Sequence, residues 1–213
     1  MLSLRAIARR PFANKVITDV SPLTAISPID GRYSRACHSL RAYFSEYALM
    51  RYRVQVELTW FSRLFEENIV AADKQTVDRV SKQDKWLKEV FDEFSVEDGT
   101  RVKEIEKVTN HDVKAIEYFL KEKFDQNSEL KDLKEYLHFS CTSEDINNLA
   151  YALMLHSSMQ EVMLPQLRAL YDSLEAMAVE LADVPMMCRT HGQSATPSTM
   201  GKEIANFAYR LKQ

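Results

Sequence analysis

The stretch INNLAYALMLHSSMQEVMLPQLRALYDSLEAMAVEL, residues 146–181, decides the fold of this chain. Its seam residues recur at alternating intervals of three and four: Ile146, Leu149, Leu153, His156, Gln160, Met163, Leu167, Leu170, Leu174, Met177 and Leu181. This spacing is typical of a coiled-coil seam and predicts one helix of about 40 residues, roughly 60 Å long. Pro165 predicts a kink within it.

A helix of this length cannot bury its seam inside a chain of 213 residues. We therefore expect the seam to pack against other long helices, including helices of other subunits.

The long helix begins after the string HFSCTSEDINN, residues 138–148. Thr142 and Asp145 fit the capping-box pattern, which predicts a helix start at this point. The free backbone N–H groups of a helix start also attract anions, and the hydroxyls of Thr142 and Ser143 would complete a pocket for a carboxylate. Helix capping alone explains why Thr142 and Asp145 occur at this spacing, and anion binding would be a second role of the same helix start.

Downstream of the long helix, His191 lies in the string THGQSATP, residues 190–197. A loop held between helices gives a proton-transfer residue a fixed geometry, so His191 is the first candidate for chemistry. Thr196 is predicted to cap a last helix, with Pro197 in its first position. This helix has no stop signal before Gln213, so we expect the chain to be cut in mid-helix.

Helical spacing also runs through the segments before the long helix, which are residues 40–68, 77–98, 102–108 and 113–124, and a short helix is expected over 129–137. Ser45 is the predicted cap of the first of these. No alternating strand pattern is present, so the fold class is predicted to be all-α. We expect an N-terminal extension over residues 1–20, a small helical domain over residues 21–139 and the start of a long-helix bundle over 140–213.

Two further motifs lie at junctions between predicted elements. Asn110 or Asp112 would cap the helix that follows them, and His111 between them either orients a ligand or is a solvated loop residue. Arg32 and Tyr33 follow a tight turn and would suit a phosphate or carboxylate, although surface packing is the more common role of such a pair.

The composition excludes several classes of function. Hydrophobic residues make up 46% and charged residues 28% of the chain, and no apolar run approaches the roughly 20 residues that span a bilayer. The formal net charge of -3 offers no basic surface for nucleic acid. Four glycines are too few for a glycine-rich phosphate loop or a dinucleotide fingerprint. We therefore expect no membrane, no nucleic acid and no cofactor bound through such a loop.

Cys37, Cys141 and Cys188 are odd in number and widely spaced, which supports neither a disulfide framework nor a zinc site. Reduced thiols favour a cytoplasmic location. Residues 1–18 carry four basic residues and no acidic one. They fit either an organelle transit peptide or an extension that has no targeting function.

Four strings in this order resemble the adenylosuccinate lyase family of the bacterial purine pathway, within the fumarase/aspartase superfamily. They are SPIDGRY (27–33), TNHDVK (109–114), HFSCTSEDINN (138–148) and RTHGQ (189–193). The resemblance covers about residues 21–213. Sister lyases share the Thr-Ser and Thr-His-Gly-Gln elements, whereas the first two strings favour this family in particular.

The resemblance implies a C–N lyase that eliminates fumarate from adenylosuccinate to give AMP, and from SAICAR to give AICAR, in purine biosynthesis. It implies no cofactor and no metal. Chains of the family are about twice as long as this one and form homotetramers through their long central helices, with active sites assembled from three subunits.

The resemblance also implies site residues. Substrate contacts are implied for Arg32, Tyr33, Asn110, His111, Asp112, Thr142, Ser143, Thr190 and Gln193. The first two of these would hold the nucleotide phosphate, and the hydroxyls of Thr142 and Ser143 would receive a succinyl carboxylate. His191 would be the general acid that protonates the departing nitrogen, a role that an imidazole with a pKa near neutrality suits.

Two departures from the family pattern stand out. Ser194 occupies a position where bacterial relatives often have proline, and the family's flexible loop with the serine base is missing from these 213 residues. We therefore expect an inactive amino-terminal portion of such an enzyme. The alternatives are a non-catalytic helical assembly module or truncated isoform, and a sister enzyme such as an argininosuccinate lyase.

Overall fold

The computed structural model describes residues 21–213, and the chain divides after Arg41 into two compact units. The possible targeting segment of residues 1–18 lies outside the described residues. The described part of the first unit consists of turns and the 3₁₀-helix η1 (His38–Leu40). A Cβ on Gly31 would lie 2.7 Å from the carbonyl oxygen of Pro22, so this turn closes only around glycine. The short helix α2 (Arg41–Phe44) follows.

The core of the second unit forms around α3 (Glu46–Glu66). Ser45 caps this helix as predicted, because its side chain accepts a hydrogen bond from the Ala48 N–H. Five helices pack against it: α4 (Lys74–Ser81), α5 (Asp84–Asp92), α6 (Val96–Thr109), α7 (Asp112–Asp125) and α8 (Ser143–Ser158). Aromatic rings fill the centre, and the rings of Phe61 and Phe124 meet edge to face at 5.0 Å.

The predicted helix over residues 77–98 is in fact two helices, α4 and α5, and Gly99 lies inside α6 instead of ending a helix. The reason is local: Ser95 and Asp98 form a capping box that starts α6 just before this glycine. The segment predicted as a short helix over residues 129–137 is the 3₁₀-helix η2 (Lys131–Tyr136).

The long helix runs without a break through α8 (Ser143–Ser158), the π-helical turn η3 (Met159–Met163) and α9 (Leu164–Glu180). The helix continues through Pro165, and the kink predicted at this residue stays a prediction. The Leu164 N–H donates to the carbonyl of Met159, five residues earlier, so a wider turn precedes the proline ring. Part of the predicted seam remains exposed, namely Leu149, Met163, Leu167, Leu170 and Met177.

A two-stranded antiparallel hairpin follows, formed by β1 (Pro185–Thr190) and β2 (Gln193–Thr199). The predictions of no strand and of a helix capped by Thr196 are wrong here. The hairpin is largely exposed, so burial imposes little alternation on its sequence. Thr199, not Thr196, caps α10 (Met200–Lys212) by accepting a hydrogen bond from the Lys202 N–H.

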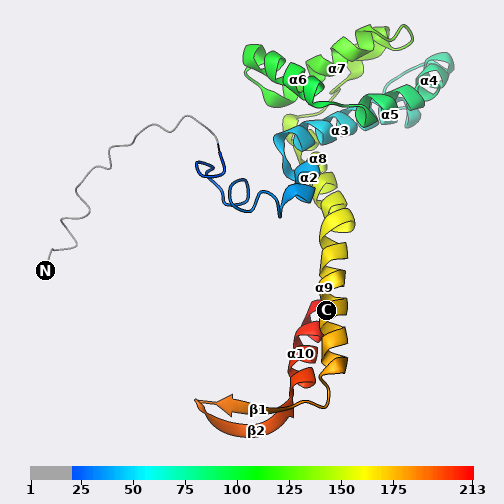
Figure 1. Ribbon diagram of the computed structural model, residues 1–213. Coiled ribbons are helices and arrows are strands. Elements are labelled where there is room, and N and C mark those ends of the chain that lie inside the picture. The colour runs from blue at the N-terminus through cyan, green and yellow to red at the C-terminus, as the bar shows by residue number, and fades with distance from the viewer. Residues whose placement is uncertain (1–20) are drawn as a thin grey trace, which may run out of the picture. The chain divides into compact units, whose positions relative to one another are not determined.

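Helix α10 lies against α9, and the hairpin extends from the end of α9 that is remote from α8 (Figure 1). A Cβ on Gly201 would overlap the carbonyl oxygen of Ala178 and lie 2.7 Å from the Cα of Ala182. Only glycine permits this close approach. The fold is mostly helical, as predicted, and no helix in residues 21–213 is both long and apolar enough to cross a membrane. A domain boundary at 139/140 stays a prediction.

Candidate functional site

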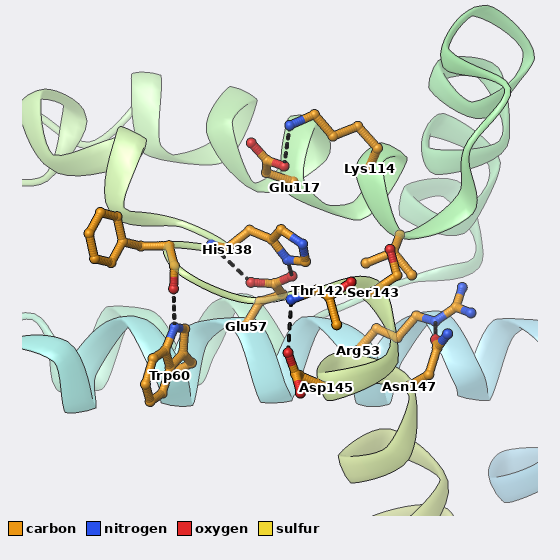
Figure 2. A network of polar contacts seen from close by, with 12 residues as sticks. Arg53, Glu57, Trp60, Lys114, Glu117, His138, Thr142, Ser143, Asp145 and Asn147 are labelled. Carbon is orange, nitrogen blue, oxygen red and sulfur yellow. Dashed lines mark hydrogen bonds and ion pairs between the residues drawn. The ribbon is translucent and has the colours of Figure 1, made fainter.

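The loop that leads into α8 has an unusual backbone. His138 and Ser140 have φ angles of 59° and 58°, in the left-handed region that non-glycine residues rarely adopt. Two side chains of α3 hold the loop (Figure 2). Glu57 accepts a hydrogen bond from the backbone N–H of His138 at 3.1 Å, and the Trp60 indole N–H donates to the Phe139 carbonyl at 2.8 Å. The core helix therefore sets the path of this loop.

Glu57 and His138 form a close side-chain pair, in which Glu57 is buried and His138 is partly exposed. The Glu57 carboxylate is fully buried, and its Oε1 lies 2.6 Å from His138 Nδ1. The hydrogen bond to Glu57 raises the pKa of His138, against the opposing effect of burial. Because a carboxylate is an acceptor, Nδ1 is the ring nitrogen that donates a proton in this hydrogen bond.

The start of α8 is where the sequence predicted it. Thr142 is the N-cap, and its backbone N–H donates to Asp145 Oδ2 at 2.8 Å. Ser143 is the first helical residue, and its Oγ lies 3.4 Å from Nε2 of His111. The structure thus brings together two predicted site motifs that are 32 residues apart.

His111 itself caps α7, in place of the predicted Asn110 or Asp112. Its Nδ1 accepts a hydrogen bond from the Lys114 N–H at 3.2 Å. Because Nδ1 is an acceptor, the neutral ring carries its proton on Nε2, the nitrogen that faces Ser143. Asn110 instead ends α6 in a left-handed conformation with φ 51°. His111 thus presents an N–H donor at the start of α8.

Arg53 ties α3 to both helix starts. This side chain is 5% exposed; its Nη2 donates to Asp112 Oδ2 at 2.7 Å and its Nε to Asn147 Oδ1 at 2.9 Å. Burial raises the pKa of Asp112, but Arg53 and the Val113 N–H together outweigh it and lower the pKa. Arg53 also lines a cavity of about 380 Å³ with Asn110, His111 and Asp112. Within residues 21–213, no cluster of His, Cys, Asp and Glu side chains could hold a metal ion.

His191 is placed very differently. It occupies the turn of the hairpin with Gly192, and their φ angles of 53° and 76° are those of a two-residue type I′ turn. Thr190 and Gln193 pair across the base of this turn. The side chain of His191 is exposed and makes no hydrogen bond or ion pair within the described part of the chain.

The long helix separates His191 from the α8 site. From Ser143 to Glu180 the helix is continuous, and a rise of 1.5 Å per residue gives it a length of about 57 Å. The two candidate regions of the second unit therefore do not meet within one chain. Arg32 and Tyr33 lie exposed in the first unit, with the guanidinium carbon 5.6 Å from the centre of the tyrosine ring.

The sequence predictions missed two buried charged residues of α3, Arg53 and Glu57. A signal for Glu57 is present, since it falls within the apolar helical period between Val54 and Phe61, where a carboxylate must be paired to be buried. Its partner His138 is 81 residues away, so the pairing itself was not readable from the sequence.

Comparisons with known proteins agree with the motifs. The sequence profile of the lyase family matches residues 31–213. Adenylosuccinate lyases from Escherichia coli (strain K12) and Haemophilus influenzae are 50% and 49% identical to this chain, each over 195 residues. The matches cover 92% and 91% of the chain but only 42% of each relative. The structure of a fumarate lyase from Mesorhizobium sp. BNC1 is 19% identical with a TM-score of 0.63, over 82% of this chain and 37% of that one, which shows a shared fold.

Proposed function

Because this chain belongs to the lyase family, we propose that it forms part of an adenylosuccinate lyase, which eliminates fumarate from adenylosuccinate to give AMP. The same reaction on SAICAR would give AICAR. The observation that carries this proposal is the 50% identity to the E. coli enzyme over 195 residues, a stretch long enough to include the motif strings. The chain spans 42% of the length of that relative.

The start of α8 is the proposed site for a succinyl carboxylate. The hydroxyls of Thr142 and Ser143 stand at the helix start, where backbone N–H groups attract anions. The capping box with Asp145 uses part of this capacity, since the Thr142 N–H donates to Asp145. The Nε2–H of His111 points at the same place, since its Nδ1 is occupied as a cap. These donors would stabilise negative charge as the proton leaves the carbon next to the carboxylate. Asn110 and Asp112 would line the pocket.

His191 is the proposed general acid. Cleavage of the C–N bond leaves a nitrogen that needs a proton, and imidazole supplies one near neutral pH. Thr190 and Gln193 would contact the substrate beside it, and Arg32 and Tyr33 would bind the nucleotide phosphate. By resemblance, the base is a serine on a flexible loop whose sequence is missing from these 213 residues.

The proposed assembly is a homotetramer in the cytoplasm, built on the long helices. Its support is geometric, because His191 and Ser143 stand at opposite ends of a helix of about 57 Å and can meet only if different chains contribute them. The exposed seam of Leu167, Leu170 and Met177 offers the apolar surface for such packing. No nucleic acid and no membrane takes part.

A chimera tests this function. Residues 21–213 replace the matching segment of E. coli adenylosuccinate lyase, and AMP formation from adenylosuccinate is followed by chromatography. We expect turnover by the chimera and none by the purified 213-residue chain alone. A folded, tetrameric chimera without turnover would contradict the proposal, and turnover by the isolated chain would contradict the need for a base from elsewhere.

A second candidate function is favoured by the exposed seam alone, namely a non-catalytic assembly module that docks on full-length subunits. Native mass spectrometry of the chain with and without the E. coli enzyme separates the two. Mixed oligomers that lack activity, together with an inactive chimera, would favour the module.

A further inference from the structure

We propose that Glu57 is a positioning residue: through its two bonds to His138, it holds the loop 138–142 in the shape that places Ser143 against His111 and so preforms the carboxylate pocket. This inference rests on the proposed function, because it concerns the same pocket. It adds a residue that none of the motif strings contains.

The backbone of the loop needs such a support. His138 and Ser140 both adopt left-handed φ angles without being glycine, and residues of this kind persist only where surrounding contacts over-determine them. The unsupported loop would relax to an ordinary conformation. Such a change of backbone direction just before Thr142 would shift the first turn of α8.

Glu57 supplies the required contacts from a rigid element. It is fully buried on α3, and its two carboxylate oxygens bind the backbone N–H and the ring of the same residue, His138. One contact fixes the backbone and the other fixes the side chain. Trp60, one turn further along α3, adds the bond to the Phe139 carbonyl. Figure 2 shows both side chains of α3 reaching the loop from the same helix.

A structural role alone would not single out this carboxylate. Glu117 on α7 is a comparable buried acid, 4% exposed, but it binds Lys114 at 2.7 Å and Lys121 at 3.2 Å, both on its own helix. It makes no hydrogen bond to the loop 138–142 within the described residues. The chain therefore offers a matched control, since Glu117→Gln changes an acid at a similar depth that acts on His138 through its charge but, within residues 21–213, forms no hydrogen bond to the loop.

The test measures the loop and the pocket separately in the full 213-residue chain. Amide hydrogen exchange at Cys141, whose N–H donates to the His138 carbonyl at 3.3 Å, reports on the loop without a direct bond to Glu57. Fumarate, titrated while the amide signals of Thr142 and Ser143 are followed by NMR, reports on the pocket. Thermal unfolding monitors the fold.

We expect Glu57→Gln to speed exchange at Cys141 and to weaken fumarate binding, each by about tenfold or more, as for a lost hydrogen bond to a charged group. Glu117→Gln should leave both within about twofold at a similar loss of thermal stability. Trp60→Phe, which keeps the ring but loses the donor, should give a smaller change of the same kind. If the Glu57→Gln variant does not fold, Trp60→Phe becomes the decisive variant.

Unchanged exchange at Cys141 in Glu57→Gln would overturn the inference, as would faster exchange with unchanged fumarate affinity. If the unsubstituted chain shows no fumarate-dependent shift at Thr142 and Ser143, the proposed carboxylate site fails and the inference fails with it. That result is distinguishable from a failure of the inference alone, because the exchange data would still record whether Glu57 holds the loop.

Discussion

The two ends of the long helix differ in the contacts that hold their candidate residues. At the start of α8, Arg53, Glu57 and Trp60 of one core helix hold the candidate residues through hydrogen bonds that span 59 to 94 residues of sequence. At the far end, His191 stands exposed on a hairpin turn that is held by its own two strands. One region is held by long-range contacts within a single chain, whereas the other exposes a histidine that, under the proposed function, would acquire its surroundings from another chain.

The difference shows how a helical protein can divide a catalytic site. The proposed carboxylate pocket would need fixed donors, and hydrogen bonds from the core helix α3 hold the loop and the helix starts beside it. The proposed general acid, His191, lies on an exposed turn and would need neighbouring groups to position it. A second chain that packs along the long helix would supply these groups. Substitutions in the two regions should therefore separate stability from activity.

The largest effect is expected at the exposed end. In the chimera, His191→Ala should lower kcat by roughly 100-fold or more, the range for a lost general acid. Thermal stability should change little, because the side chain is exposed and makes no hydrogen bond or ion pair in the described part of the chain. Steady-state kinetics and a thermal melt measure the two quantities. His38→Ala, which removes another exposed histidine, is the control, and near-normal turnover of the His191 variant would return that residue to a structural role.

The opposite pattern is expected at the start of α8. His138→Ala removes the imidazole from the buried Glu57 carboxylate and leaves it only the backbone N–H of residue 138, which should lower the free energy of unfolding by about 3 kcal/mol. Urea denaturation of the 213-residue chain measures this loss. A change below about 0.5 kcal/mol, the usual range for a surface substitution, would show that the pair does not hold the loop.

The pH dependence sharpens the same contrast. The pKa of His138 is raised in the folded state by its bond to Glu57, so the pair stabilises the fold fully below the unfolded pKa of about 6.5. This contribution is lost as the pH rises through the raised pKa of His138. The difference in unfolding free energy between the unsubstituted chain and Glu57→Gln should therefore shrink from about pH 6 to about pH 9. If the difference in unfolding free energy instead grows from about pH 6 to about pH 9, the prediction that Glu57 stabilises the protonated form of His138 is wrong.

The smallest effect is expected in the hairpin turn. Gly192 has a φ of 76°, so Gly192→Ala should lower the free energy of hairpin opening by about 1 kcal/mol. Native-state hydrogen exchange at the cross-strand amides measures it. Exchange in the core helix α3 should not change, and an equal change in both places would mean that the hairpin and the core open together.

Local signals predicted much of the fold. The spacing of Val54, Leu58 and Phe61 and the cap at Ser45 identified α3, and Thr142 with Asp145 located the start of α8. These features depend on residues within a few positions of one another. The hairpin was missed because its residues are exposed and carry no buried face, and its turn at His191 and Gly192 was interpreted as a loop between helices.

The caps near the site show that local sequence does not decide which of several neighbouring residues caps a helix. Asn110, His111 and Asp112 are all capping residues or their neighbours, and the sequence favoured Asn110 or Asp112 for α7. The chain uses His111, because Asp112 is committed to Arg53 on α3 and Asn110 ends the preceding helix. Which of three adjacent side chains becomes the cap was therefore settled by a partner 59 residues away.

By itself, the sequence determined the helical class, the long seam from residue 146 to 181 and the helix start that presents Thr142 and Ser143, since periodicity and capping act over a few residues. Only the tertiary structure decided that Glu57 meets His138 and that Arg53 joins Asp112 to Asn147, because these partners are brought together by packing across many residues of chain. The physical reason is burial. A charged group in the core must find an opposite charge or a hydrogen bond, and the fold determines which one lies within reach.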